Sequence, residues 1–192
     1  MAYTEIKAKL KDMISEKRYK HSLGVARFAE ELAIMYGADG EKAYIAGLLH
    51  DCARDLEIGE LKRYAISCGV EIGEIEEVHP VLLHAPVGAC IAEREFGISD
   101  PEILQAISSH TVLNSAPTLL DKIVYVADLG EPEREFKEAE RVREKARSDL
   151  DKAVIYAIDI SFIYLIEEHK LIHPTTLFAR NLLIKEVYYG QN

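Results

Sequence analysis

The dipeptide His50-Asp51 closes an apolar run that begins at Ala43, and both of its side chains can bind a metal ion. An unpaired carboxylate on such an apolar stretch would cost several kcal/mol once the stretch packs into a core. A divalent cation would satisfy both side chains, because imidazole and carboxylate groups are ligands of iron, manganese, cobalt and zinc. The pair therefore predicts a metal site at the end of a helix.

Three more histidines and one more aspartate repeat this pattern, each near the end of a predicted helix or late in an apolar run. No single member is specific, because one histidine or one His-Asp pair is common by chance. The ordered series is more informative, since a helical domain can bring helix ends to one cleft. His79 and His169 lack this support. The candidate set is His21, His50, Asp51, His84, His110 and Asp128.

The chemistry that this set could perform is hydrolysis with a metal-activated water as nucleophile. The sequence has no P-loop, no Rossmann glycine pattern and no Gly-x-Ser-x-Gly elbow, so covalent catalysis on serine has no support. A bound metal would lower the pKa of a water molecule and offset charge on a phosphoryl oxygen. The residues therefore favour a metal-dependent phosphohydrolase.

The elements that must position these residues are predicted to be helices almost throughout, because apolar residues recur at helical spacing between glycine and proline signals. Segment 119–129 could also be read as a strand, but a lone strand would have no partner. We therefore expect a single all-α domain over residues 1–192. The expected helices are 6–14, 23–33, 43–49, 56–68, 79–96, 101–110, 119–129, 138–147, 150–168 and a last helix to 189, capped by Thr175 or Thr176.

Composition narrows the class of protein and its partners. With 192 residues, 48% of them hydrophobic, the chain can bury a sizeable core. Its formal net charge of −10 argues against nucleic acid as a partner, because an extended nucleic-acid surface needs a basic footprint. An acidic protein can still bind a small polyanion, provided that a metal or a few arginines overcome the surrounding field.

Signals for membranes and for disulfides are weak in this sequence. No apolar run reaches the roughly 18 residues that cross a bilayer. The polar N-terminus lacks the apolar region of a signal peptide, so we expect a cytoplasmic protein with no membrane partner. Cys52, Cys68 and Cys90 are odd in number and lack Cys-x-x-Cys spacing. We therefore expect buried thiols rather than disulfides or a zinc ribbon.

Longer segments around these residues resemble the HD-domain superfamily of metal phosphohydrolases, and within it the YqeK type, the bacterial symmetrical diadenosine tetraphosphate hydrolases. The Glu-Pro-x-Arg motif at 131–134 and the His-Pro-x-Thr motif at 173–176 make the resemblance specific, because they are not general HD features. The resemblance covers roughly residues 15–185. The matching segments are 19–26, 50–54, 84–89, 120–128, 131–134 and 173–181.

This resemblance implies an HD-domain helical bundle with a nucleotide site at a metal centre. The metal would be of the iron type, with manganese or cobalt as alternatives, and Asp51 and His84 would be catalytic. The metal ligands would be His21, His50, Asp51 and Asp128. The nucleotide contacts would be His21, Asp51, Cys52, Ala53, Arg54, His84, His110, Thr111, Asp128, Arg134, Leu171, Ile172, His173, Pro174, Thr175 and Thr176.

The residues themselves agree in type with a phosphate ligand. Arg54 and Arg134 can donate charge-assisted hydrogen bonds to phosphate, which an acidic protein needs locally. His173 precedes Pro174 at the start of a helix, where free backbone N–H groups favour an anion or a base acceptor. We therefore expect the polyphosphate to meet arginines and histidines, with the loop at 173–176 near the base and sugar.

Two positions depart from the family pattern. Val112-Leu113 follow His110-Thr111, where the family usually has Thr-Gly, and this change leaves the dinucleotide preference open. Arg54 stands where the family often has lysine, which keeps the charge but alters the geometry of a phosphate contact.

The predicted reaction is hydrolysis of diadenosine tetraphosphate to two ADP. The expected partners are a dinucleoside polyphosphate substrate and its ADP product. The sequence is also compatible with a homodimer. One alternative is another HD enzyme, a nucleotidase or a deoxynucleotide triphosphohydrolase, against which the motifs at 131–134 and 173–176 argue. An alternative of another class is a nucleotide sensor that binds without turnover, against which the complete metal series argues.

Overall fold

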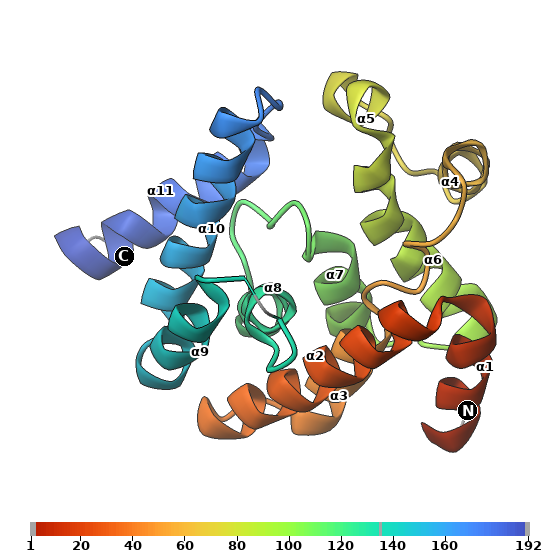
Figure 1. Ribbon diagram of the computed structural model, residues 1–192, viewed down its shortest axis with the longest axis horizontal. Coiled ribbons are helices and arrows are strands. Elements are labelled where there is room, and N and C mark those ends of the chain that lie inside the picture. Colours follow the sequence, from red (N-terminus) through yellow and green to blue (C-terminus); the bar gives the residue numbers. More distant parts are fainter. Residues whose placement is uncertain (1–2, 135, 191–192) are drawn as a thin grey trace.

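Helices build the fold in the computed structural model, which describes residues 3–134 and 136–190 (Figure 1). No strand occurs in these two segments, so the predicted all-α class is confirmed. In the same residues no helix is long and apolar enough to cross a membrane. The elements in chain order are α1 (Tyr3–Met13), α2 (Glu16–Met35), α3 (Gly40–Leu49), α4 (Ile58–Ser67), α5 (Glu74–Val78), the 3-10 helix η1 (Pro80–Leu83), α6 (His84–Phe96), α7 (Pro101–Ser109), α8 (Leu119–Gly130), α9 (Ala139–Ser148), α10 (Leu150–Glu167) and α11 (Pro174–Tyr189).

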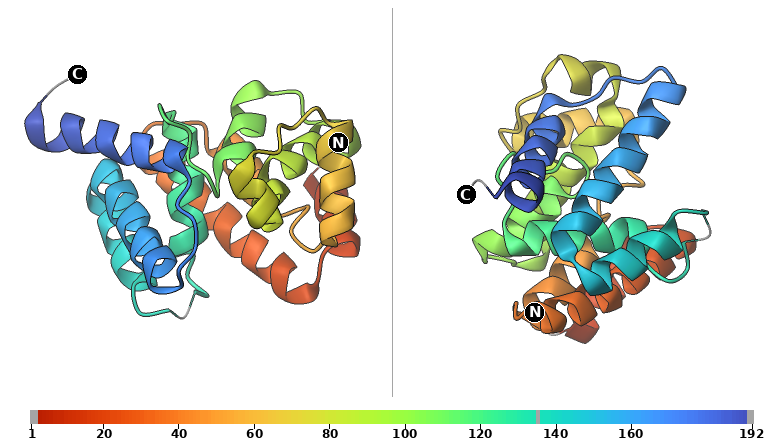
Figure 2. Two further views of the ribbon diagram at one scale, coloured as in Figure 1. Left: turned by 90° about the horizontal axis from the view of Figure 1, so that it is seen from above. Right: turned by 90° about the vertical axis from the view of Figure 1, so that its left-hand side faces the viewer.

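Helix α8 lies at the centre of the arrangement, and most of its residues are buried (Figure 1). Thr118 and Asp121 cap its start reciprocally, since each side chain accepts the backbone N–H of the other residue. The helix predicted over 119–129 is therefore confirmed. Helix α8 packs against α2, α3, α7, α9 and α10. In Figures 1 and 2, α10 and α11 lie on one side of α8 and α4 to α6 on the other, so α8, the helix that carries Asp128, stands between these two groups of helices.

Helices α2 and α3 approach closely because small residues meet where they pack. A Cβ atom added to Gly47 of α3 would lie 2.9 Å from the Cα of Ala26 and 3.1 Å from the carbonyl oxygen of Val25, both in α2. Backbone atoms cannot move aside cheaply in a close-packed interior, so glycine is needed here. This contact holds the end of α3, where His50 lies, against the helix that carries His21.

Replacing Gly47 by alanine is expected to lower the free energy of unfolding by about 1–3 kcal/mol, because the added methyl group forces two helix backbones apart. Urea denaturation followed by circular dichroism measures the change. Gly59→Ala is the matched control, since a Cβ at Gly59 in α4 meets nothing within 4 Å. The control should be as stable as the parent or slightly more stable. Equal stability of the two variants would contradict this account of the packing.

Two helix starts on the N-terminal side differ from the sequence prediction. Helix α2 begins at Glu16 rather than near residue 23, because Ser15 caps it by accepting the backbone N–H of Arg18. The helix predicted over 79–96 has its first turn as the 3-10 helix η1 from Pro80 and continues directly as α6 from His84 to Phe96, whereas the short helix α5 before it was not predicted. His79, the residue before Pro80, lies outside helical geometry, so the helical run begins at Pro80.

The cap predicted for the last helix is also wrong. His173 is the N-cap of α11, and its Nδ1 accepts the backbone N–H of Thr175, so neither Thr175 nor Thr176 has this role. Pro174 then occupies the first turn, where its missing N–H and its fixed φ angle suit a helix start. The sequence prediction placed the start too late because histidine is not a usual N-cap residue.

The expectation of three free thiols is wrong for two of the cysteines. Cys68 at the end of α4 and Cys90 in α6 form a disulfide, with their Cα atoms 6.2 Å apart. The guanidinium of Arg94 also donates to the carbonyl of Ser67 across the same contact. The pairing depends on how α4 packs on α6, which the spacing of the cysteines does not reveal. Cys52 is a buried free thiol, as expected.

Candidate metal centre

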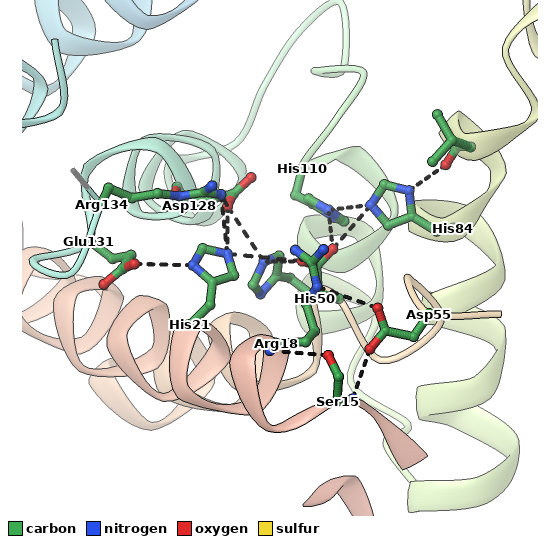
Figure 3. A network of polar contacts seen from close by, with 12 residues as sticks. Ser15, Arg18, His21, His50, Asp55, His84, His110, Asp128, Glu131 and Arg134 are labelled. Atoms are coloured by element: carbon green, nitrogen blue, oxygen red, sulfur yellow. Dashed lines mark hydrogen bonds and ion pairs between the residues drawn. The ribbon is translucent and has the colours of Figure 1, made fainter. Parts of the chain in front are cut away.

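All six candidate ligands meet at one place between α2, α3, α6, α7 and α8 (Figure 3). They fall into three overlapping groups, and within each group the ligand atoms lie within 4.8 Å of one another. The prediction that helix ends bring these side chains together is therefore confirmed. The groups are His21, His50 and Asp51; His50, His110 and Asp128; and Asp51, His84 and His110.

Three buried histidines share one local arrangement that frees the same ring nitrogen. The Nδ1 of His50 contacts the carbonyl oxygen of Gly47 at 2.7 Å, and the Nδ1 atoms of His84 and His110 contact the carbonyls three residues before them. A carbonyl oxygen can only accept, so Nδ1 is the donor in each ring. In the neutral form each Nε2 therefore keeps a lone pair, and the three Nε2 atoms face the centre of the site.

His21 is oriented by a side chain instead of a carbonyl. Its Nδ1 lies 3.2 Å from Oε1 of Glu131, and its Nε2 accepts a hydrogen bond from Arg134 at 3.3 Å. Glu131 is buried, and a Cβ at Gly24 would lie 2.4 Å from its Oε2, so glycine makes room for this carboxylate. A carboxylate on one ring nitrogen fixes the ring for metal binding through the other. The sequence prediction omitted Glu131, although it opens the 131–134 motif.

The two aspartates complete the site with negative charge. Oδ1 of Asp51 lies 3.2 Å from Nε2 of His84 and 3.6 Å from Nε2 of His110. Nε2 of His50 lies 3.5 Å from Asp51 and 3.6 Å from Asp128, and it is buried with no hydrogen-bond partner among the described residues. A cation at this point would satisfy the lone pairs and both carboxylates together. The donor set therefore fits a divalent metal ion.

The charges of the centre also fit a divalent metal ion. Burial raises the pKa of Asp51 and of Asp128, but the surrounding imidazoles lower both pKa values more strongly, so both remain well below the usual range. Burial opposes a charge on His50, yet the Asp51 carboxylate raises the His50 pKa to about 10. Burial lowers the pKa of His110. The carboxylates are therefore ionised at neutral pH, and a metal ion would compete with the proton on His50.

Two arginines flank the centre, one beside each aspartate (Figure 3). Nη1 of Arg18 lies 2.6 Å from Oδ2 of Asp51, and Nη2 of Arg134 lies 2.7 Å from Oδ1 of Asp128. Each guanidinium is only partly buried, so it can also meet a ligand. The sequence prediction included Arg134 and missed Arg18. The available signal was its position three residues before His21, which places both on one face of a helix.

One cavity borders the centre through His21, and another includes Thr111, the residue after His110. The first, here the α2 cavity, has a volume of about 600 Å³. Its lining is Ser15, Lys17, Arg18, Lys20, His21, Glu131, Glu133, Arg134 and Phe136. The second, here the α10 cavity, has a volume of about 290 Å³ and a more apolar wall. Its lining includes His79, Val81, Thr111, Tyr125, Ser161, Leu171, His173 and Thr176.

The comparisons with known proteins agree with this geometry. The family model of the HD domain matches residues 18–132. The chain is 38% identical to the symmetrical bis(5'-nucleosyl)-tetraphosphatase of Bacillus subtilis (strain 168), over 94% of this chain and 96% of that protein. It is 34% identical to the Staphylococcus aureus (strain NCTC 8325 / PS 47) protein of the same name, over 89% of each.

The chain belongs to the HD-domain family of symmetrical bis(5'-nucleosyl)-tetraphosphatases. A crystal structure from the same superfamily supports the fold. It is that of a predicted HD superfamily hydrolase involved in NAD metabolism from Clostridium acetobutylicum, with a TM-score of 0.93 and 40% identity. The match covers 97% of this chain and 98% of the other.

Four of the residues expected to contact nucleotide in this family lie together in one cavity. Thr111, Leu171, His173 and Thr176 line the α10 cavity. The hydroxyl oxygen of Thr111 is buried and has no hydrogen-bond partner among the described residues, so it is available to a ligand. His173 also lies 3.3 Å from a carboxylate oxygen of Glu76, which ties the start of α11 to α5.

The segment after Asp51 offers less to a ligand than the sequence suggested. Cys52 and Ala53 are buried, and the thiol of Cys52 donates to the carbonyl of Gly88, so their side chains serve packing. Arg54 is half-buried and stands outside the described linings of both cavities. Arg18 and Arg134 are thus the arginines that the structure places beside the metal centre.

Proposed function

We propose that this protein hydrolyses diadenosine tetraphosphate to two molecules of ADP. The observation that carries the proposal is the convergence of four histidine Nε2 atoms and two ionised carboxylates beside a basic cavity, in a chain of this family. Water adds its oxygen to one of the two central phosphorus atoms. The bond from that phosphorus to the central bridging oxygen breaks, and the bridging oxygen leaves with the second ADP.

His21, His50, Asp51 and Asp128 would hold a divalent metal ion, which we propose to be iron, with manganese or cobalt as alternatives. Such an ion supplies Lewis acidity, because it lowers the pKa of water and offsets charge on a phosphoryl oxygen. The residues supply position. Glu131 orients the ring of His21, and the carbonyl of Gly47 orients that of His50.

We assign the proton chemistry to Asp51 and His84. Oδ1 of Asp51 is held next to Nε2 of His84 while its Oδ2 accepts from Arg18, so the carboxylate is fixed toward the centre. Asp51 would orient the attacking water, and His84 Nε2 would take up its proton. His110 and Arg134 would steady the phosphoryl oxygens during the displacement.

One nucleoside of the substrate would occupy the α10 cavity. The free hydroxyl of Thr111 can bind a polar group there, and the apolar wall suits a base. We propose contacts from His173 and Thr176 to the base or sugar, as expected from their motif. Leu171, Ile172, Pro174 and Thr175 complete this segment, and Cys52, Ala53 and Arg54 would act through their backbone or from farther out. The proposed enzyme is a single domain that acts in the cytoplasm.

A substrate panel tests this function against other HD activities. The metal-loaded protein should hydrolyse diadenosine tetraphosphate with a kcat/KM at least about a hundredfold above that for deoxynucleoside triphosphates or nucleoside monophosphates, because neither of these has the bridge between two nucleoside diphosphates that the site is proposed to cleave. Initial rates under equal metal loading provide the comparison. Preference for a deoxynucleoside triphosphate would overturn the proposal. Nucleotide binding without turnover would instead indicate a sensor.

A further inference from the structure

The metal centre meets the α2 cavity through His21 and adjoins the α10 cavity through Thr111, the residue after His110. Its four histidine rings form a row, with centroids 5.2 Å apart between His21 and His50, 4.8 Å between His50 and His110, and 5.0 Å between His110 and His84. His21, at one end of the row, lines the α2 cavity. Thr111, which follows His110 near the other end, lines the α10 cavity. A ligand that follows the row can therefore reach the α2 cavity at one end and the α10 cavity near the other.

A dinucleoside tetraphosphate has two identical halves, each a nucleoside diphosphate. Cleavage at the central oxygen requires that one half lies on each side of the reacting phosphorus. We propose that the α2 cavity binds the second nucleoside diphosphate, the half that leaves, while the α10 cavity binds the first. This inference rests on the proposed function and assigns a place to the part of the substrate that the α10 cavity cannot hold.

The charges around the α2 cavity suit two phosphates. Four cations line it: Lys17, Arg18 and Lys20 from α2, and Arg134 from the segment after α8. Arg18 and Arg134 each bind a metal-ligand carboxylate through part of the guanidinium, which leaves further N–H donors for phosphate oxygens. Lys17 is exposed, and Lys20 forms only a solvent-exposed pair with Glu16. In a chain with a net charge of −10, this is a local concentration of positive charge.

Two carboxylates also line the cavity, and they do not cancel this charge. Glu131 faces the ring of His21 and accepts the backbone N–H of Glu133, so its oxygens are already engaged. The Glu133 carboxylate is the one acidic group of the described lining that can oppose phosphate. Among the described residues of the lining, four cations therefore stand against two carboxylates, and Lys17 and Lys20 are the exposed cations.

Phe136 supplies a surface for the second base. It is 38% exposed and lines the α2 cavity as its apolar aromatic ring among the described residues, beside the imidazole of His21. Stacking on such a ring tolerates any base, because every base has a π-face. The volume of about 600 Å³ falls within the roughly 300–1,000 Å³ typical of small-molecule sites. The cavity therefore combines a phosphate end beside the metal centre with an aromatic wall.

The test compares Lys17→Ala/Lys20→Ala with a control double variant, Arg63→Ala/Lys185→Ala. The control removes the same charge from exposed positions on α4 and α11, outside the described linings of both cavities. The metal-loaded Lys17→Ala/Lys20→Ala variant should lose at least about tenfold in kcat/KM for diadenosine tetraphosphate, and the control should not. Calorimetric titration with ADP should show two sites per chain in the parent and control, and one in the Lys17→Ala/Lys20→Ala variant.

A second comparison isolates the base. Phe136→Ala should lower kcat/KM for the dinucleotide several-fold and leave that for adenosine 5'-tetraphosphate unchanged, because the latter has no second nucleoside to stack. An equal loss on both substrates would overturn the role of Phe136.

The inference and the proposed function can fail separately. If the parent protein hydrolyses the dinucleotide, but removal of the two lysines changes neither kcat/KM nor the number of ADP sites, the α2 cavity is not the second half-site. A single ADP per chain in the parent would also overturn it. If the parent does not hydrolyse the dinucleotide at all, the proposed function fails, and the ADP titration alone decides whether a second nucleotide site exists.

Discussion

Asp51→Asn is expected to lose its metal and at least about 1,000-fold in kcat/KM, which corresponds to about 4 kcal/mol of transition-state stabilisation. The carboxylate lies within 3.6 Å of the Nε2 atoms of His50, His84 and His110, so every part of the centre depends on its charge. Neutral asparagine removes half of the negative charge that the two aspartates supply. Elemental analysis of the purified protein and steady-state rates measure both effects, and His50→Ala should behave similarly.

Asp55→Asn provides the matched control. It makes the same chemical change four residues later, at an exposed carboxylate that accepts the backbone N–H of Ser15 and lies 3.8 Å from Nε of Arg18, but belongs to none of the metal-ligand groups. This variant should keep its metal, and circular dichroism should show unchanged helical content in all variants. Full metal occupancy in Asp51→Asn, or in His50→Ala, would contradict the assigned ligand set.

Arg134→Ala is expected to lower kcat/KM by an amount that corresponds to about 1.5–3 kcal/mol, the scale of a charge-assisted hydrogen bond. Its guanidinium contacts Asp128 and His21 and lines the α2 cavity, so its loss removes a phosphate donor and loosens a metal ligand. Steady-state measurement of kcat and KM gives the size of the loss.

Arg134→Lys separates the two contributions of this arginine. Lysine keeps the charge but cannot present the planar fork of donors, so an intermediate loss is expected. If kcat and KM of Arg134→Ala equal those of the parent protein, the assignment of Arg134 to phosphate binding is wrong.

The residues of the metal centre were predictable from sequence because their types and order carry the signal. Apart from His21, which lies in the second turn of α2, each histidine or aspartate of the set stands at a helix end or in an apolar run, where an unsatisfied polar group would be costly. The supporting residues were harder to predict. Arg18 joins the site only because α2 starts at Glu16, about two turns earlier than its apolar periodicity suggests. Glu131 has a role only once α8 and α2 lie side by side.

Features that depend on packing between distant segments could not be predicted from the sequence. The Cys68–Cys90 disulfide needs α4 to lie against α6. The meeting of the His84 and His110 rings, whose Nε2 atoms lie 3.1 Å apart, needs α6 to pack against α7. Both follow from tertiary contacts, which periodicity along one helix does not encode.

The products of diadenosine tetraphosphate hydrolysis test the central claim most directly. If the metal centre acts between two half-sites, the bridge is cut at its middle. Chromatography of a complete digest by the metal-loaded protein should then give two equivalents of ADP for each substrate consumed. AMP and ATP in equal amounts would show that the bridge is held off-centre, and would contradict the proposed function.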